Sequence, residues 1–96
     1  KELGLTLSSI TKDIRMRQNI PDDVSGLLVT KIEQNSDAEV KGIRPGDIIQ
    51  EINQSSVNDI NSFKKIIDSL SDTKKGVLLL INRQGTINFV ALKLNQ

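Results

Sequence analysis

Histidine and cysteine are both absent from this sequence of 96 residues, which also holds no Trp or Tyr and only two Phe. Without His or Cys, the chain cannot build Cys–His catalysis, a Ser–His–Asp triad or an ordinary zinc site from its own residues. The shortage of aromatic side chains removes the platforms on which nucleic-acid bases stack. Common nucleophilic enzymes, zinc proteins and nucleic-acid binders are therefore disfavoured, and the sequence implies no cofactor.

Charge and apolar runs are modest as well. Thirteen basic and twelve acidic residues give a net charge of +1 with no basic stripe, which disfavours nucleic acid and anionic membranes as partners. The longest apolar run, residues 77–81, is far shorter than the ~20 residues that a membrane-spanning helix needs. The chain begins with Lys1 rather than Met, so we expect residues 1–96 to be a single domain excised from a larger protein.

Strand patterns recur along the chain. Leu3, Leu5 and Leu7 alternate with small or polar residues, which predicts a strand that buries one face and extends to Ile10. Further strands are predicted at 27–32, 47–52, 77–83 and 87–94, with a short one at Val57. The 77–83 strand begins without polar alternation and is expected to be buried on both faces. Gln84-Gly85 predicts a hairpin turn, and Phe89-Val90 breaks the alternation of the last strand, which indicates a bulge or burial of both faces.

Two short helices are predicted from capping signals. Thr11 is a candidate N-cap for a helix that ends before Pro21. Ser36 and Glu39 have the spacing of a capping box, and Gly42 ends the short helix that follows.

The third helix is amphipathic and begins after Asp59, its candidate cap. Its apolar positions are Ile60, Phe63, Ile66, Ile67 and Leu70. Three of them, Phe63, Ile66 and Leu70, are enough to seal the helix on a sheet. Ile60 and Ile67, with the stem of Lys64, then lie on an adjacent flank that can face a groove. The alternative is that all five apolar residues belong to the core.

This succession of strands with inserted helices predicts an α+β fold: a partly open antiparallel barrel of five to six strands, capped by two to three helices.

The residues that could be catalytic are weak candidates. A Ser–Lys dyad would need one of Lys64, Lys65, Lys74 or Lys75, which are better explained as solvated charges. The carboxylate pair Asp22-Asp23 suits a turn better than a metal site.

One passage of the sequence is distinctive enough to indicate a protein family. Residues 36–39 followed by 42–49, with the sequence GIRPGDII, closely resemble the middle of a PDZ domain, where a short capped helix runs into a Pro-Gly-Asp turn and a strand. Gln54-Ser55 departs from the family pattern, in which a glycine often stands in that turn.

A second passage is Leu3-Gly4-Leu5 at the entry to the first strand. In the PDZ family, such a hydrophobic–Gly–hydrophobic loop holds the terminal carboxylate of a bound peptide through its backbone amides. The physical argument is that successive N–H groups turned towards one point bind an anion, while glycine permits the conformation and the close approach.

The order of these signals and the insert at 11–21 narrow the resemblance to the PDZ domains of HtrA (Do or Deg type) periplasmic serine proteases, with the strand order of bacterial members. The opening Leu-Gly-Leu-x-Leu and the segment 21–29 are most similar to the second PDZ domain of those enzymes. The resemblance implies a periplasmic location and a protease domain with its triad upstream in the parent protein.

On this resemblance, the domain binds apolar C-termini or unfolded peptide segments by strand addition along residues 5–10. The peptide-binding candidates are Leu3, Gly4, Leu5, Thr6, Leu7, Ile60, Lys64 and Ile67. Among them, Leu5, Leu7 and Ile67 are expected to line a pocket for the last side chain. The alternative is a structural module whose open edge pairs with another domain of the parent protease and never meets substrate.

Overall fold

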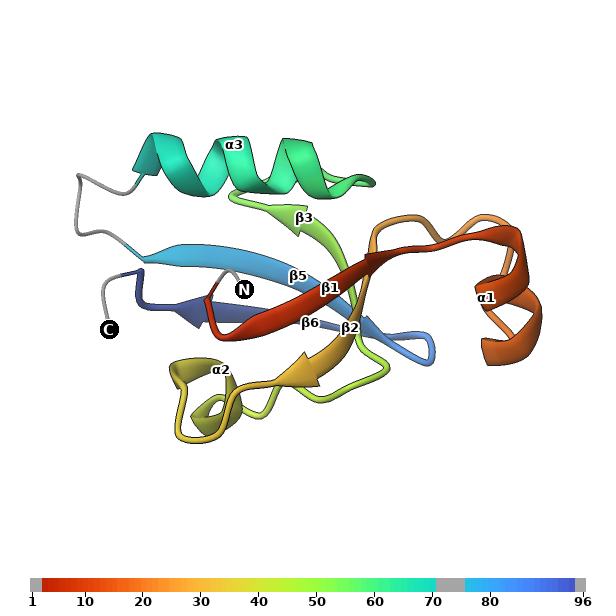
Figure 1. The fold of residues 1–96 in the computed structure, drawn as a ribbon, viewed down its shortest axis with the longest axis horizontal. Helices are drawn as coiled ribbons and strands as arrows, with labels where there is room; N and C mark the ends of the chain where they lie inside the picture. The colour runs from red at the N-terminus through yellow and green to blue at the C-terminus, as the bar shows by residue number, and fades with distance from the viewer. Residues whose placement is uncertain (1–2, 71–75, 95–96) are drawn as a thin grey trace.

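The computed structural model describes residues 3–70 and 76–94, which form an antiparallel sheet and three helices (Figure 1). The strands are β1 (Leu5–Ser9), β2 (Leu27–Ile32), β3 (Ile48–Ile52), β4 (Ser55–Ser56), β5 (Val77–Arg83) and β6 (Thr86–Leu92). The helices are α1 (Lys12–Gln18), α2 (Asp37–Val40) and α3 (Ile60–Leu70). The loop predicted at 71–76 lies, except for Gly76, outside the described residues.

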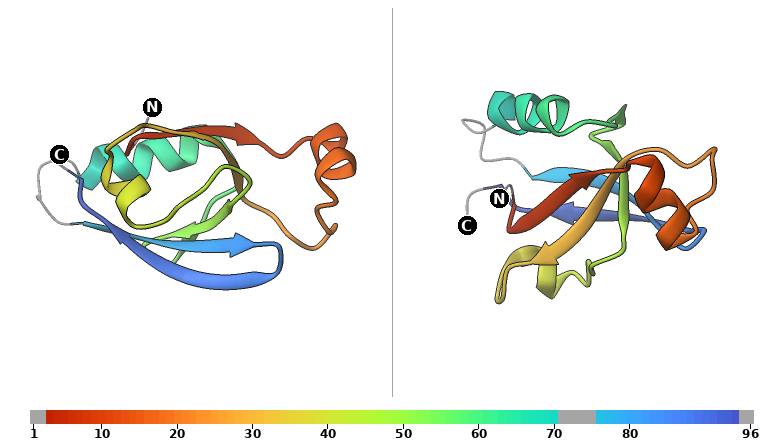
Figure 2. Two further views of the ribbon diagram at one scale, coloured as in Figure 1. Left: turned by 90° about the horizontal axis from the view of Figure 1, so that it is seen from below. Right: turned by 45° about the vertical axis from the view of Figure 1, so that its right-hand side comes forward.

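The sheet has the strand order β1-β2-β3-β5-β6, with β4 paired to β3, and every pairing is antiparallel. β1 and β6 are therefore its two edges. Figure 2 shows a strongly bent sheet with α3 and α2 at its two opposite ends, while α1 lies beyond the end of β1. The predicted α+β architecture, a partly open antiparallel barrel with helical caps, is confirmed.

The main core lies between the inner face of the sheet and the helices α2 and α3. It is aliphatic apart from one aromatic residue, Phe63, which is fully buried. Ile67, at 8% exposure, is the second buried residue of α3, whereas Ile66 and Leu70 are only half-buried. The prediction that Ile66 and Leu70 seal this helix while Ile67 stays on its flank was therefore wrong. The contact with the sheet runs along Phe63 and Ile67, and the other apolar residues border it.

A second, smaller cluster lies on the outer face of the sheet, under α1. Its buried members are Ile20, Leu28 and Ile48. Because side chains alternate across a strand, Ile48 and its neighbour Ile49 point to opposite faces, and Ile49 belongs to the main core.

The short β4 strand differs from the prediction. Asn53 and Gln54 both have positive φ (50° and 70°) and turn the chain so tightly that Ser55 already pairs with Ile52. Val57, predicted as the strand residue, is instead buried after it, and its N–H donates to the Gln50 carbonyl at 3.1 Å.

The β5–β6 hairpin also corrects two predictions. The inner face of β5 is buried, but Leu78 and Leu80 on its outer face are only half-buried, so β5 does not bury both faces. β6 pairs with β5 in unbroken register, without the predicted bulge, and leaves Phe89 61% exposed. Bulges occur at two other points of the sheet. Thr30 is the extra residue of β2 where it pairs with β1, and Gln50 is the extra residue of β3 where it pairs with β5.

The predicted helix caps form. The side chains of Thr11, Ser36 and Asp59 each accept the backbone N–H three residues further on, at 3.1, 3.2 and 2.8 Å. The Glu39 carboxylate also reaches back, although it accepts the N–H of Asn35 at 2.8 Å rather than that of the cap residue itself.

Candidate peptide-binding groove

The candidate groove begins with the free edge of β1. In the described part of the chain β1 pairs only with β2, so its other edge presents unpaired main chain. The pairing shifts between Thr6 and Leu7, where Thr30 is the extra residue of β2, and the Thr30 hydroxyl donates to the Thr6 carbonyl at 3.1 Å. The bulge bends the β1–β2 ribbon while leaving the outer edge of β1 open.

Helix α3 contacts β1 and forms the other wall (Figure 1). Its start is fixed by Asp59, whose carboxylate accepts the Ser62 N–H at 2.8 Å and the Ser62 hydroxyl at 3.1 Å. The backbone hydrogen bond from Ser62, followed by its side-chain bond, lowers the pKa of Asp59 below its usual 3.8. The carboxylate thus stays charged at neutral pH and holds the N-terminal end of the helix.

The residues predicted to bind peptide meet in this region. One hydrophobic cluster contains Leu3, Leu5, Leu7, Ile60 and Ile67. Leu5 and Ile67 are buried, at 1% and 8% exposure, so they lie under the groove rather than along its surface. Leu3, Leu7 and Ile60 are half-buried, as are Gly4 and Thr6, and Lys64 is exposed. The apolar surface that a ligand can reach is thus smaller than the sequence predicted.

The Leu3-Gly4 loop has an unusual backbone. Leu3 and Gly4 both have left-handed φ angles, 62° and 74°, the first of which is uncommon for a residue with a side chain. The Gly4 carbonyl accepts the Glu33 N–H at 2.8 Å, and a Cβ on Gly4 would lie 2.7 Å from the Ser36 Cβ. The chain therefore needs glycine here for its own packing, a reason that the sequence did not reveal.

A cavity of about 450 Å³ lies beside this loop, lined by Leu3, Gly4, Glu33, Asn35, Ser36, Asp37, Lys93 and Leu94. The Asp37 carboxylate accepts the Lys93 N–H at 2.9 Å and a bond from the Lys41 ammonium at 3.3 Å. These bonds, that of Lys93 first, lower the pKa of Asp37 below its usual 3.8. Lys93, which follows β6, therefore lies beside the Leu3-Gly4 loop.

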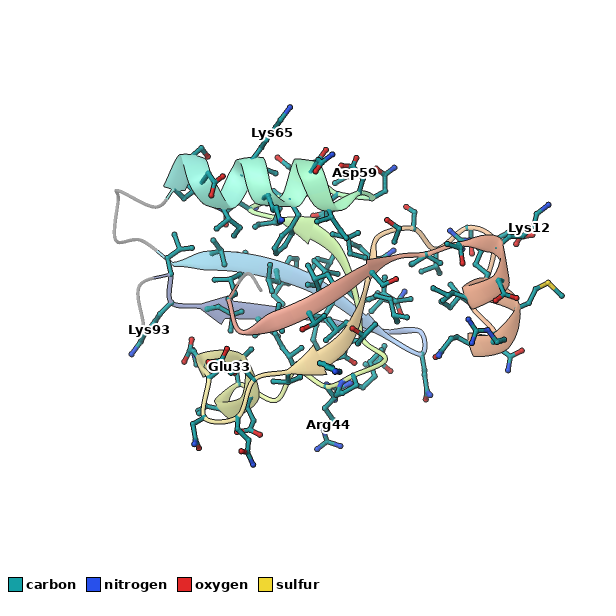
Figure 3. All side chains as sticks on the ribbon, viewed as in Figure 1. Lys12, Glu33, Arg44, Asp59, Lys65 and Lys93 are labelled. Atoms are coloured by element: carbon teal, nitrogen blue, oxygen red, sulfur yellow. The ribbon has the colours of Figure 1, made fainter. Side chains whose placement is uncertain are left out.

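Figure 3 shows Lys65 on α3 pointing away from the sheet, and Lys93 on the side of the molecule that holds α2. None of the helices in the described part of the chain is long and apolar enough to cross a membrane. The same residues contain no group of three or more side chains that could hold a metal ion.

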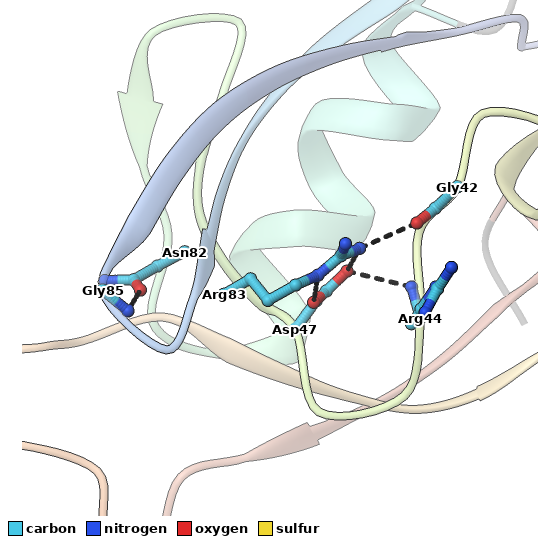
Figure 4. Close-up of polar contacts among 6 residues, drawn as sticks. All are labelled: Gly42, Arg44, Asp47, Asn82, Arg83 and Gly85. Carbon is cyan, nitrogen blue, oxygen red and sulfur yellow. Dashed lines mark hydrogen bonds and ion pairs between the residues drawn. The ribbon is translucent and has the colours of Figure 1, made fainter.

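An ion pair that the sequence analysis missed lies outside the groove. The carboxylate of Asp47, predicted only as a residue of the turn and the start of the next strand, accepts two hydrogen bonds from the Arg83 guanidinium at the end of β5 (Figure 4). The two residues stand 36 positions apart, and no local signal links them.

These features define a small antiparallel α+β domain with an open strand edge next to a helix. The family model of the PDZ domain matches residues 1–82, and the chain belongs to the PDZ domain family.

Relatives at the sequence level are proteases. The chain is 33% identical, over 91 residues, to a probable periplasmic serine endoprotease, DegP-like, from Rickettsia conorii. It is 39% identical over 72 residues to a protein of the same description from Bartonella henselae. These alignments cover 94% and 74% of this chain but only 17% and 14% of the two relatives.

Solved structures share the fold. The HtrA3 PDZ domain bound to a phage-derived ligand has a TM-score of 0.79 at 23% identity, covering 95% of this chain and 81% of that one. The HtrA-type protease AlgW with a decapeptide has a TM-score of 0.71 at 19% identity, covering 95% of this chain and 27% of that one. Both likenesses show the PDZ fold, as predicted.

Proposed function

We propose that this domain binds peptides with apolar C-termini as part of an HtrA-type periplasmic serine endoprotease. The observation that carries the proposal is the open edge of β1 beside α3. An extended peptide that adds to this edge satisfies the free N–H and C=O groups of β1, and the adjacent side chains then select its sequence. Support also comes from the structural neighbours, since the HtrA3 domain holds the ligand FGRWV, which ends in valine.

The terminal carboxylate of the peptide would sit at Leu3, Gly4 and Leu5. Backbone N–H groups in a tight left-handed turn are suited to an anion, and no acidic side chain belongs to these three residues. The last peptide side chain would contact Leu7 and Ile60, above Leu5 and Ile67. Thr6 and the stem of Lys64 would border the peptide further along.

The parent protein is proposed from the relatives. Since this chain spans less than a fifth of their length, proteolysis would belong to a domain elsewhere in the parent. This chain has neither His nor Cys and would serve substrate binding or regulation. The relatives are described as periplasmic, which supports that location. The assignment to the second PDZ domain, and of residues 1–96 to a single domain excised from a larger protein, stays a prediction.

An NMR titration of the ¹⁵N-labelled domain with pentapeptides that end in valine or leucine tests the proposal. We expect saturable shifts along β1 and α3, with a dissociation constant on the order of 1 μM. Ile60→Asp should weaken binding at least tenfold, because it places a charge against the apolar end of the peptide. Lys65→Ala, on the side of α3 that points away from the sheet, is the matched control and should change nothing.

Ile60 is preferable to Ile67 for this test, because a charge at the buried Ile67 would disrupt the core. A monomeric, folded domain that binds no apolar-ended peptide would contradict the proposal. That result would favour a structural module whose edge pairs with another domain of the parent.

A further inference from the structure

A second cavity lies on the outer face of the sheet, between α1 and the β5–β6 turn. Its volume is about 430 Å³, within the range of ordinary ligand pockets. The floor is the smaller hydrophobic cluster, formed by Ile20, Leu28 and Ile48. The groove residues belong to the main core cluster, so the two sites lie over different apolar clusters on different faces of the sheet.

The walls of this cavity are held in place by hydrogen bonds. On one side, the Arg15 guanidinium donates to the carbonyls of Pro21 and Val24 at 2.8 and 2.7 Å, which fixes the chain that follows α1. On the other side, the Gly85 N–H donates to the Asn82 side chain at 2.8 Å and fixes the hairpin turn (Figure 4). The cavity is therefore formed before any ligand arrives.

The chemistry of the rim is specific. No charged residue lines the cavity. Four carboxamide side chains do: Gln18, Asn19, Asn82 and Gln84. The carboxamide of Asn82 is buried and forms hydrogen bonds with Gln50 and Gly85. The side chains of Gln18, Asn19 and Gln84 form no hydrogen bond with any described residue. A carboxamide both donates and accepts, as a peptide group does, and offers no counter-charge to a carboxylate or an ammonium group.

Two exposed apolar side chains of β6 lie on the same face of the sheet as Asn82, which lines the cavity. Ile87 pairs with Asn82 and shares its outer face, and Phe89 follows two residues later on the same face. These side chains are 48% and 61% exposed. A small ligand would fill only the cavity, whereas an extended polypeptide can fill it and continue across Ile87 and Phe89.

We propose that this cavity is a second peptide site, which takes one apolar side chain from an internal, uncharged stretch of an extended polypeptide. The site differs from the β1 groove because it needs no free terminus. It does not depend on peptide binding at β1. If both sites are occupied by one unfolded chain, the second contact forms at a high effective concentration, which strengthens capture without tight binding at either site.

The probe is N-acetyl-leucine methylamide, which carries one apolar side chain between two peptide groups and no charge. In an NMR titration of the ¹⁵N-labelled domain, we expect saturable shifts at Asn19, Gln84 and Gly85 at millimolar concentrations. N-acetyl-glycine methylamide, which lacks the side chain, should produce no saturable shift there. N-acetyl-leucine, which carries a free carboxylate, should bind more weakly than the methylamide.

The decisive variant is Gln84→Glu, which adds a charge to the uncharged rim and should weaken the probe by roughly threefold to tenfold. Gln54→Glu is its matched control. Gln54 is also an exposed glutamine in a turn with positive φ (70°, compared with 50° for Gln84), but it does not line the cavity. Binding that is unchanged in Gln84→Glu, equally weakened in Gln54→Glu, or absent from the cavity would overturn the proposal. A C-terminal peptide titrated into the same samples reports on the β1 groove separately, so failure at one site is distinguishable from failure at the other.

Discussion

Arg83 clamps the buried carboxylate of Asp47 through two hydrogen bonds, Nε to Oδ1 at 2.7 Å and Nη2 to Oδ2 at 2.8 Å (Figure 4). Asp47 is 1% exposed, and its Oδ2 also accepts the Arg44 N–H at 2.9 Å. Arg83 Nη2 donates further to the Gly42 carbonyl at 2.7 Å. Asp47 raises the pKa of Arg83 through these bonds and its charge, so the guanidinium of this ion pair stays protonated at physiological pH. It ties the end of β5 to the loop between α2 and β3.

Removing the guanidinium should destabilise the domain, because it leaves a buried carboxylate without its counter-charge. We expect Arg83→Met to lower the free energy of unfolding by about 2 kcal/mol, less than for a fully buried pair because Arg83 is partly exposed to water. Urea denaturation measures this change. The double variant Asp47→Asn with Arg83→Met should recover part of the loss, since neither charge remains. A single variant with the wild-type midpoint and slope would show that the pair does not stabilise the fold.

Acid should weaken the fold through Asp37 and Asp59. Both pKa values are lowered from 3.8 in the folded chain, so the unfolded chain takes up protons first as the pH falls. Their stabilising contribution is therefore complete above the unfolded pKa and is lost as the pH falls through the lower folded values. Urea midpoints measured from pH 6 down to pH 2 should decline below about pH 4.

Asp37→Asn should flatten this decline, because an amide oxygen can still accept the Lys93 N–H but does not titrate. Asp22→Asn changes an exposed turn carboxylate that makes no side-chain hydrogen bond with any described residue, and it should leave the decline as it is. Equal pH profiles for wild type and Asp37→Asn would show that protonation of Asp37 does not contribute to the loss of stability in acid.

Gly4→Ala should cost about 2 kcal/mol of stability, because it adds a Cβ at a left-handed position against Ser36. A double-mutant cycle with Ser36→Gly separates the two causes. Removing the Ser36 Cβ relieves the contact but not the backbone strain, so the two changes should couple favourably. Purely additive effects would mean that the approach of Gly4 to Ser36 does not matter. Because a Gly4 variant destabilises the domain itself, it is unsuitable for testing how closely a peptide approaches this loop.

Local signals predicted most of the fold. Alternating leucines marked β1, the spacing of Ser36 and Glu39 marked α2, and Gln84-Gly85 marked the hairpin turn, whose residues have φ of 50° and 93°. Each of these features depends on neighbours within a few residues, so composition and spacing contain the information.

What the sequence did not predict depends on contacts between distant segments. The pairing of Asp47 with Arg83 and the approach of Gly4 to Ser36 exist only once the sheet has closed. The choice between Ile66 and Ile67 as the buried residue of α3 needs the angle at which the helix meets the sheet, which helical periodicity alone does not fix.

The central claim, that the loop at Leu3, Gly4 and Leu5 receives a peptide carboxylate, is tested most directly by titrating the isolated domain with matched peptides. The two peptides share one apolar-ended sequence and differ only in a free or an amidated C-terminus. A charge-assisted hydrogen bond contributes about 1.5–3 kcal/mol, so the account predicts that the amide binds at least tenfold more weakly than the acid. Equal affinity for the acid and the amide would contradict it.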